Sequence, residues 1–175
     1  EGAPVFLPRE DADIAAEIKK ALEAKGVAFQ IGAAVKKVAD AGDHAEVTFA
    51  REGAEETLAA DAVLVATGRR PNTDGLNAAE AGVELTPRGA VKVDEKLRTT
   101  APNIWAMGDV VGGLQFTYVS LDDFRIVWSQ LSGGDYDAAR RKNVPYSVFI
   151  DPSFSRVGLN EREAREAGRN VKVLT

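Results

Sequence analysis

A single carboxylate, Asp109, ends the stretch whose residue types are best suited to chemistry. Residues 99–109 read TTAPNIWAMGD, in which an apolar run at 104–107 is followed by Gly108 and Asp109. Such a run is typical of a strand covered on both faces, and open α/β sheets bind ligands at the carboxyl ends of strands. Gly108 has no Cβ, so a ligand can approach its backbone closely. We therefore predict a ligand site at Asp109; the alternative is a plain turn in which the aspartate caps backbone N–H groups.

The residues after Asp109 favour an electron-rich ligand. A glycine pair at 112–113 precedes a predicted helix over 117–131, whose first turn presents unbonded backbone N–H groups. An ionised carboxylate offers only acceptors and suits a hydroxyl-rich chain, while a helix N-terminus carries roughly +0.5 charge and stabilises a nearby anion. Thr117 would act there through its backbone, and an ordinary N-cap role is compatible with that.

This block resembles the second flavin-binding motif of the pyridine nucleotide-disulfide oxidoreductases, the flavoprotein family of glutathione reductase, lipoamide dehydrogenase and mercuric reductase. A second stretch, residues 66–73 (ATGRRPNT), is similar to the family's ATGRxPNT crossover between its nicotinamide and flavin domains. Two motifs in the family's order are far more specific than either alone. Residues 115–125 (QFTYVSLDDFR) resemble the mercuric-reductase-related branch and, within it, the reactive-chlorine-resistance flavoproteins.

The resemblance implies an α/β fold: an FAD/NAD(P)-binding dinucleotide fold with an antiparallel β-meander, plus the start of an α+β interface domain. Residues 1–68 would be the C-terminal part of the NAD(P)-binding domain and 69–140 the C-terminal part of the FAD-binding domain. Residues 141–175 would begin the domain that makes a homodimer. The chain would then be a fragment, because the family's GxGxxG loops and redox cysteine pair would precede residue 1 and its His-Glu acid/base pair would follow residue 175.

The resemblance also implies cofactors and the residues that hold them. Asp109 would hold the flavin ribityl chain, and the helix N-terminus would face the flavin N1 and C2 carbonyl. The full FAD set is Gly108, Asp109, Gln115, Phe116 and Thr117, and the NAD set is Glu1, Gly68 and Arg69. No catalytic residue and no metal ligand is expected within the chain.

The implied activity is that of an oxidoreductase that uses FAD and NADH. Hydride would pass from NADH through flavin to a cysteine pair outside this chain, and on to a small-molecule disulfide, a metal ion or an oxidant. The alternative is a non-catalytic nucleotide-binding or dimerisation module that keeps the scaffold without the redox centre.

Glu1 bears on the choice of nicotinamide. The acid that ends the second strand of a dinucleotide fold accepts hydrogen bonds from the adenosine ribose and repels a 2′-phosphate. In that place Glu1 favours NADH over NADPH, whereas an arbitrary terminal residue favours neither, and both interpretations stay open. Arg9, Arg69 and Arg70 could offset a phosphate charge, but surface or crossover roles are favoured for them.

Composition excludes several other classes of protein. The chain is 45% hydrophobic and 28% charged, as globular chains are, and its net charge of −5 argues against nucleic acid as a partner. No apolar run approaches the roughly 20 residues that span a bilayer, and no export leader is seen, so we expect a cytoplasmic protein with no membrane partner. The chain has no cysteine, and its one histidine, His44, lies in an expected solvated hairpin turn.

Local patterns predict the elements around these residues. A helix over 11–25 shows Ile14, Ile18 and Leu22 at every fourth position and stops at Gly26. The predicted strands are 27–31, 35–39, 45–50, 55–58 and 62–66, the middle three forming a meander turned at Gly42 and Gly53. A β-hairpin is expected from 83–85 to 91–93, with its turn at 87–89.

The second half of the chain yields further predictions. Along the helix over 117–131, a packing stripe is expected from Tyr118, Leu121, Phe124, Trp128 and Leu131. Asp122 and Asp123 are expected to complement the helix dipole, and the basic run 140–142 to be a solvated linker. Strands are predicted at 145–150 and 156–159, followed by a helix that opens with a capping box of Asn160 and Glu163 and stops at Gly168.

Overall fold

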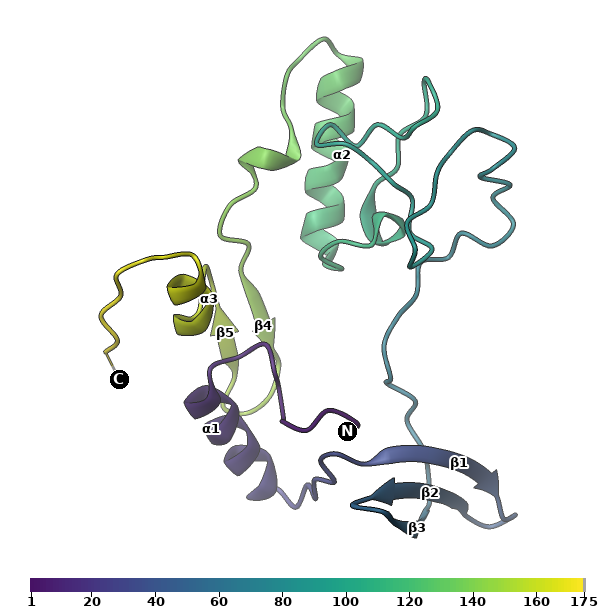
Figure 1. The fold of residues 1–175 in the computed structure, drawn as a ribbon, viewed down its shortest axis with the longest axis vertical. Coiled ribbons are helices and arrows are strands. Elements are labelled where there is room, and N and C mark those ends of the chain that lie inside the picture. The colour runs from purple at the N-terminus through teal and green to yellow at the C-terminus, as the bar shows by residue number, and fades with distance from the viewer. Residues whose placement is uncertain (175) are drawn as a thin grey trace. The chain divides into compact units, whose positions relative to one another are not determined.

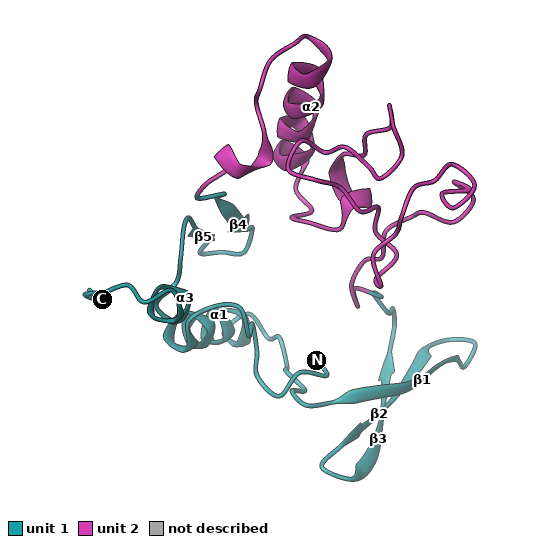
Figure 2. Cartoon of the chain, turned by 45° about the horizontal axis from the view of Figure 1, so that its top comes forward, with its two compact units in different colours: residues 1–65, 143–175 teal, residues 66–142 magenta. Residues whose placement is uncertain are grey.

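The computed structural model describes residues 1–174, which form two compact units (Figure 2). Unit 1 takes in Glu1–Val65 and the chain from Asn143 onward, and unit 2 is Ala66–Lys142. The division into nicotinamide, flavin and interface domains stays a prediction. Within residues 1–174, no helix has the length and apolar character needed to cross a membrane.

Unit 1 contains the predicted meander. Strands β1 (Ala34–Asp40), β2 (Ala45–Arg51) and β3 (Ala54–Ala60) pair antiparallel in that order (Figure 1). Both turns use glycine in the left-handed region, with φ of 100° at Gly42 and 84° at Gly53, which L side chains rarely adopt. The predicted meander is therefore confirmed, with each strand longer than its pattern by one to three residues.

Unit 1 also holds three short elements from the end of the chain and one helix from its start. The helix α1 (Ala12–Glu23) confirms the prediction over 11–25 and buries Ala15 and Ile18. The predicted strand at 27–31 is wrong, because these residues form no ladder. The later elements are β4 (Tyr146–Val148), β5 (Phe154–Arg156) and α3 (Glu161–Glu166).

The helix α3 begins with the predicted capping box. The Asn160 side chain accepts a hydrogen bond from the Glu163 backbone N–H at 2.8 Å, and the Glu163 carboxylate accepts one from the Asn160 N–H at 3.0 Å. Asn160 also donates through Nδ2 to the Arg9 carbonyl at 2.8 Å, and Asp11 accepts from the Glu161 N–H at 3.0 Å. The cap therefore both starts α3 and fastens it to the segment before α1.

A partly buried polar contact strengthens this junction. Tyr146 donates its hydroxyl to the Glu10 carboxylate, and the Arg156 guanidinium lies 3.5 Å from the same carboxylate. Burial, together with the hydrogen bond to Glu10, raises the pKa of Tyr146 to about 12. The phenol is therefore held in its neutral, donating form.

Unit 2 is built around a small apolar cluster and one long helix. Val83, Val91 and Ala101 form the buried cluster, against which Ala106 and Val110 pack. The predicted hairpin from 83–85 to 91–93 is present as a single antiparallel bridge between Leu85 and Val91, closed by a Gly89 N–H to Thr86 carbonyl bond of 2.9 Å. The long helix α2 (Thr117–Leu131) follows the 3₁₀ turn η1 (Gly108–Val111), and a second 3₁₀ turn, η2 (Ala138–Arg140), comes near the end of the unit.

Three further predictions are wrong. The buried strand at 104–107 is reduced to one bridge between Arg98 and Trp105, and the 62–66 run forms no strand. On α2 the predicted packing stripe is exposed, and the buried face consists of Val119, Asp123 and Ile126. A two-faced strand or an apolar stripe needs neighbouring elements on its faces, and a hydrophobic pattern does not say where along the chain these elements come from.

Candidate functional site

The turn that carries Asp109 is a tight, glycine-bounded structure. Asp109 lies in η1, and its side chain is 51% exposed, so both carboxylate oxygens remain available as acceptors. Gly108 and Gly112 bound the turn with φ of 76° and 73°, and the Gly112 N–H donates to the Asp109 carbonyl at 3.0 Å. The backbone thus places an accessible carboxylate on a fixed loop.

Both glycines have a left-handed φ, and at Gly112 space also excludes a Cβ. A Cβ at Gly112 would lie 2.7 Å from the Ala90 Cβ, and one at Gly108 would lie 3.0 Å from the Ser120 Oγ. The Val91 N–H, beside Ala90, donates to the Val110 carbonyl at 2.9 Å. The turn is therefore held between the 85–91 hairpin on one side and α2 on the other.

Arg69 lies beside Asp109. Its Nη1 is 3.6 Å from the Asp109 Oδ2, although the sequence predicted Arg69 as a nicotinamide residue. An exposed ion pair of this length is worth about 0–1 kcal/mol, so it leaves Asp109 able to accept hydrogen bonds from a ligand. The pairing spans forty positions of chain, and no local pattern signals it.

The N-terminus of α2 follows the turn directly. The helix begins at Thr117 with Phe116 as N-cap, and no side chain caps it. The alternative for Thr117, an ordinary N-cap role, is therefore not found, because Thr117 is the first helical residue. The Phe116 carbonyl accepts from the Val119 and Ser120 N–H groups at 3.0 Å each, and Gln115 is half-buried just before it. A helix start without a side-chain cap can use its backbone N–H groups on an electron-rich ligand group.

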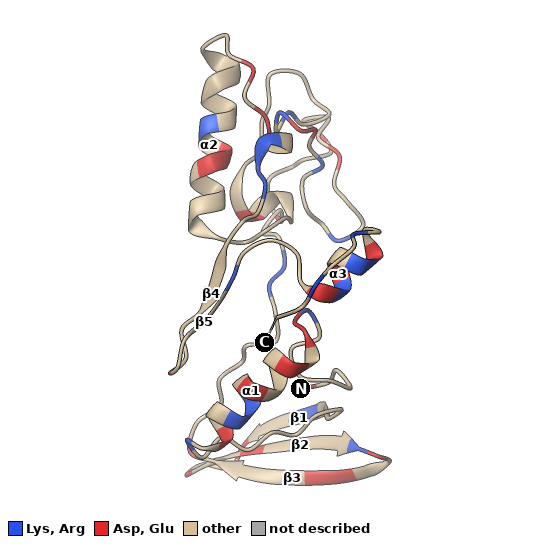
Figure 3. Cartoon of the chain, turned by 90° about the vertical axis from the view of Figure 1, so that its left-hand side faces the viewer, with Lys and Arg blue, Asp and Glu red and all other residues tan. Residues whose placement is uncertain are grey.

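A cluster of charged side chains lies under the turn, and sequence reasoning missed its role. Asp123 accepts from the Gly108 N–H at 2.8 Å, and Arg141 hydrogen-bonds Asp123 and, through Nε, the Asp122 Oδ2 at 2.8 Å. The Tyr136 hydroxyl donates to the other Asp122 oxygen at 3.0 Å. Figure 3 shows how few charged residues α2 carries besides this aspartate pair.

The basic run 140–142 is not a solvated linker at Arg141, whose side chain is only 19% exposed. Burial by itself lowers the pKa of Arg141, but hydrogen bonds to Asp122 and Asp123 outweigh that effect, so its pKa is raised. The hydrogen bond to Asp122 likewise raises the pKa of Tyr136. Adjacent aspartates on a mostly apolar helix, followed by a basic run, were the available signal.

Comparison with known proteins decides the family. Residues 1–123 match the family model described as pyridine nucleotide-disulphide oxidoreductase. The chain belongs to this family. It is 49% identical over 176 residues to the "Probable pyridine nucleotide-disulfide oxidoreductase RclA" of Escherichia coli K12. The matched region covers 100% of this chain and 39% of that protein. It is 37% identical to the dihydrolipoyl dehydrogenase of Geobacillus stearothermophilus, covering 98% of this chain and 36% of that protein.

A solved structure agrees. The "Cu(II) complex of HOCl-induced flavoprotein disulfide reductase RclA from Escherichia coli" matches with a TM-score of 0.86 and 51% identity, over 94% of this chain and 38% of that one. The predicted α/β flavoprotein fold and the resemblance to the reactive-chlorine-resistance branch are confirmed. The chain spans about two-fifths of the length of these relatives.

The other residues that the sequence analysis singled out lie in both units. Gly68, with φ of 123°, and Arg69 belong to unit 2, together with the whole predicted FAD set, and Glu1 belongs to unit 1. The Glu1 carboxylate accepts from the Ala3 N–H at 2.8 Å. His44 lies in the β1–β2 turn, with its Nδ1 2.6 Å from the Asp43 carboxylate. Across residues 1–174 no group of three or more His, Cys, Asp or Glu side chains is arranged to hold a metal ion.

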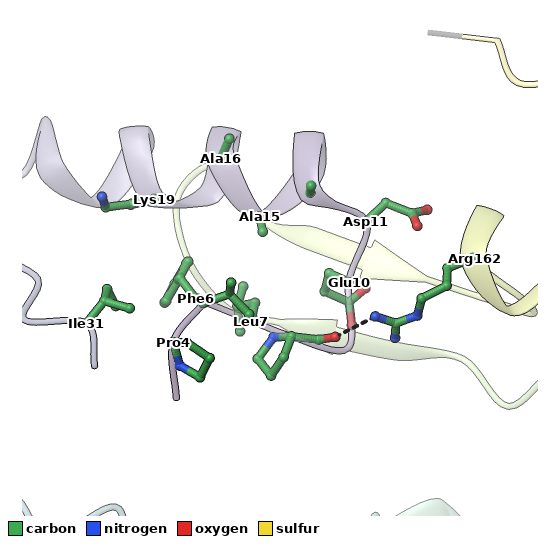
Figure 4. A pocket seen from close by; sticks show the side chains of 13 residues that line it. Pro4, Phe6, Leu7, Glu10, Asp11, Ala15, Ala16, Lys19, Ile31 and Arg162 are labelled. Carbon is green, nitrogen blue, oxygen red and sulfur yellow. Dashed lines mark hydrogen bonds between the residues drawn. The ribbon is translucent and has the colours of Figure 1, made fainter. Parts of the chain in front are cut away.

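Unit 1 has a groove that contains none of the predicted site residues. It measures about 670 Å³ and runs between α1 and the segment before it, lined mainly by apolar side chains such as Phe6, Leu7 and Ala15 (Figure 4). Arg162 reaches its edge and donates to the Pro8 carbonyl at 3.0 Å. Glu10, Asp11, Lys19 and Arg162 also line this groove, but neither the glycine-bounded turn nor the start of α2 belongs to it, so Asp109 stays the candidate site.

Proposed function

We propose that this chain forms part of the cofactor-binding scaffold of an FAD-dependent, nicotinamide-dependent oxidoreductase. The observation that carries the proposal is the Asp109 turn: an accessible carboxylate on a glycine-bounded loop that leads into an uncapped helix N-terminus. Membership of the pyridine nucleotide-disulphide oxidoreductase family supports it.

The residues present fit a flavin. Gly108 and Gly112 give the loop its left-handed ends, and Gly112 has no room for a Cβ beside Ala90, while the Asp109 carboxylate stays open. In this proposal Asp109 accepts hydrogen bonds from ribityl hydroxyls, and Gln115, Phe116 and Thr117 present the start of α2 to the flavin ring. The positive end of the α2 dipole would then stabilise electron density there without a titrating group.

When bound, FAD supplies two-electron transfer between a reduced nicotinamide and a cysteine pair, and this chain contains no cysteine. A small-molecule disulfide or a metal ion is proposed as the terminal acceptor. The E. coli relative supports both, since it is described as a disulfide reductase and its structure as a Cu(II) complex. We also propose that the complete protein is a homodimer, with residues 141–175 beginning its dimer-forming domain.

Replacing Asp109 by alanine tests the flavin site. In the full-length protein this change should weaken FAD binding by about tenfold or more, because charge-assisted hydrogen bonds worth roughly 1.5–3 kcal/mol are lost. The measurement is the FAD dissociation constant of the reconstituted apoprotein. Asp74→Ala is the matched control, since Asp74 is also an exposed aspartate of unit 2 paired with an arginine. Unchanged affinity in the Asp109 variant would refute the assignment.

The proposed electron donor is NADH. A carboxylate at the ribose repels a 2′-phosphate by on the order of 1 kcal/mol in water-like surroundings and by more where it is partly buried. Glu1→Arg in the full-length protein should therefore shift preference toward NADPH. The check is the ratio of kcat/KM for NADH and NADPH in both forms. If the unaltered protein already prefers NADPH, Glu1 has only the backbone-capping role seen with Ala3.

A further inference from the structure

Unit 2 buries one carboxylate that the proposed function does not use. Asp123 is 1% exposed and lies on the inner face of α2 with Val119 and Ile126. A buried carboxylate is costly unless it is paired and hydrogen-bonded, so its partners explain its presence.

Each oxygen of Asp123 has its own partner. Oδ2 accepts from the Gly108 N–H at 2.8 Å, and Oδ1 is hydrogen-bonded by the Arg141 guanidinium. Asp122 shares Arg141 through a 2.8 Å bond and accepts from Tyr136. The two neighbouring aspartates thus share Arg141 as their cation. Asp123 in addition accepts a hydrogen bond from Gly108, the residue that precedes Asp109.

The grip is well suited to positioning. Ser120 lies three residues before Asp123 on α2, and its Oγ lies 3.0 Å from the position that a Cβ on Gly108 would take, so one helix face both contacts the turn and bonds its backbone. The Asp123 carboxylate is attached to a helix and is also paired with Arg141, so it has little freedom to move. The start of η1, and with it the backbone of Asp109, is therefore set by Asp123.

We propose that Asp123 is a positioning residue for flavin binding: by holding the Gly108 N–H, it fixes where Asp109 presents its carboxylate. This inference rests on the proposed FAD site at Asp109. The competing interpretation is that Asp123 only neutralises Arg141 and clamps α2 to the segment that follows it. In that case Asp122, which shares Arg141, would matter to FAD as much as Asp123 does.

Asp122→Ala is therefore the matched control for Asp123→Ala. Each substitution removes one carboxylate from Arg141, and only the Asp123 change releases the Gly108 N–H. Both are made in the full-length protein, together with the wild type and Asp109→Ala. Three quantities are measured: the FAD dissociation constant of the apoprotein, the visible circular dichroism of bound flavin, and the thermal unfolding midpoint of the apoprotein.

Asp123→Ala should bind FAD at least about tenfold more weakly than Asp122→Ala, with an altered flavin circular dichroism spectrum. A smaller difference in affinity overturns the positioning role. Failure of the proposed function gives a different pattern, in which the wild type does not bind FAD or Asp109→Ala binds it as the wild type does.

Asp123→Asn decides the question if the alanine variant does not fold. The amide oxygen can still accept the Gly108 N–H, while the negative charge that Asp123 presents to Arg141 is lost. Positioning predicts an FAD dissociation constant within about threefold of wild type and an unchanged flavin spectrum, even though the unfolding midpoint falls. A larger loss of affinity overturns the proposal, since it would show that the charge pair with Arg141 carries the effect.

Discussion

Single glycines decide whether the Asp109 turn can form. Gly112 combines a left-handed φ of 73° with a Cβ position 2.7 Å from the Ala90 Cβ. Gly112→Ala should destabilise the full-length protein by about 2–5 kcal/mol, the sum of roughly 1–2 for the left-handed backbone and 1–3 for overpacking. Urea unfolding measures the loss.

Two variants separate these causes. Gly133 has a similar φ of 82° with nothing within 4 Å of its Cβ position, so Gly133→Ala should show only the backbone cost. Ala90→Gly in the Gly112→Ala background should recover the overpacking part, a coupling that a double-mutant cycle reports. Equal losses of unfolding free energy for Gly112→Ala and Gly133→Ala would show that the structure around Ala90 shifts to accept the new methyl group at little cost.

Among the elements, α3 shows how a local signal can serve two purposes. Asn160→Ala should cost about 1–3.5 kcal/mol, combining roughly 0.5–2 for the lost cap with 0.5–1.5 for the lost bond to the Arg9 carbonyl. Asn160→Ser should restore the cap part alone, because serine caps well but does not reach Arg9. Chemical denaturation of the full-length variants checks the order wild type, Ser, Ala. A serine variant no better than alanine would contradict the cap contribution.

The same contrast between local and distant signals explains what the sequence predicted. The meander turns at Gly42 and Gly53 and the Asn160–Glu163 box depend on residues a few positions apart, and all are found. The Arg69–Asp109 pair and the grip of Asp123 on Gly108 join distant parts of the chain, and no periodicity encodes them. Burial of the 104–107 run was predicted wrongly for a related reason. A hydrophobic pattern indicates that a segment packs against other elements, but it does not indicate which elements these are.

At the scale of the whole molecule, the chain exposes apolar surface that a stable monomer would bury. Phe149 is 94% exposed and Leu64 is 89% exposed, and the α2 stripe adds Phe124, Trp128 and Leu131. The relatives have more than half of their length outside the matched region, so they have further chain with which to cover such faces. Large exposed apolar patches promote association.

We therefore expect the isolated 175-residue chain to self-associate and to show no NADH-dependent disulfide reductase activity, because it has no cysteine to carry electrons to a disulfide. Light scattering after size exclusion measures the association.

Trp128 supplies a sharper test. In the isolated chain its side chain is mostly exposed, so Trp128→Ala should reduce association with little loss of stability. In the full-length protein, where we expect the stripe to be covered, the same change should cost about 3–5 kcal/mol. The expectation is contradicted if the isolated chain is monomeric, or if Trp128→Ala changes the free energy of unfolding equally in the two proteins. Either result would show that the stripe is also exposed to solvent in the full-length protein.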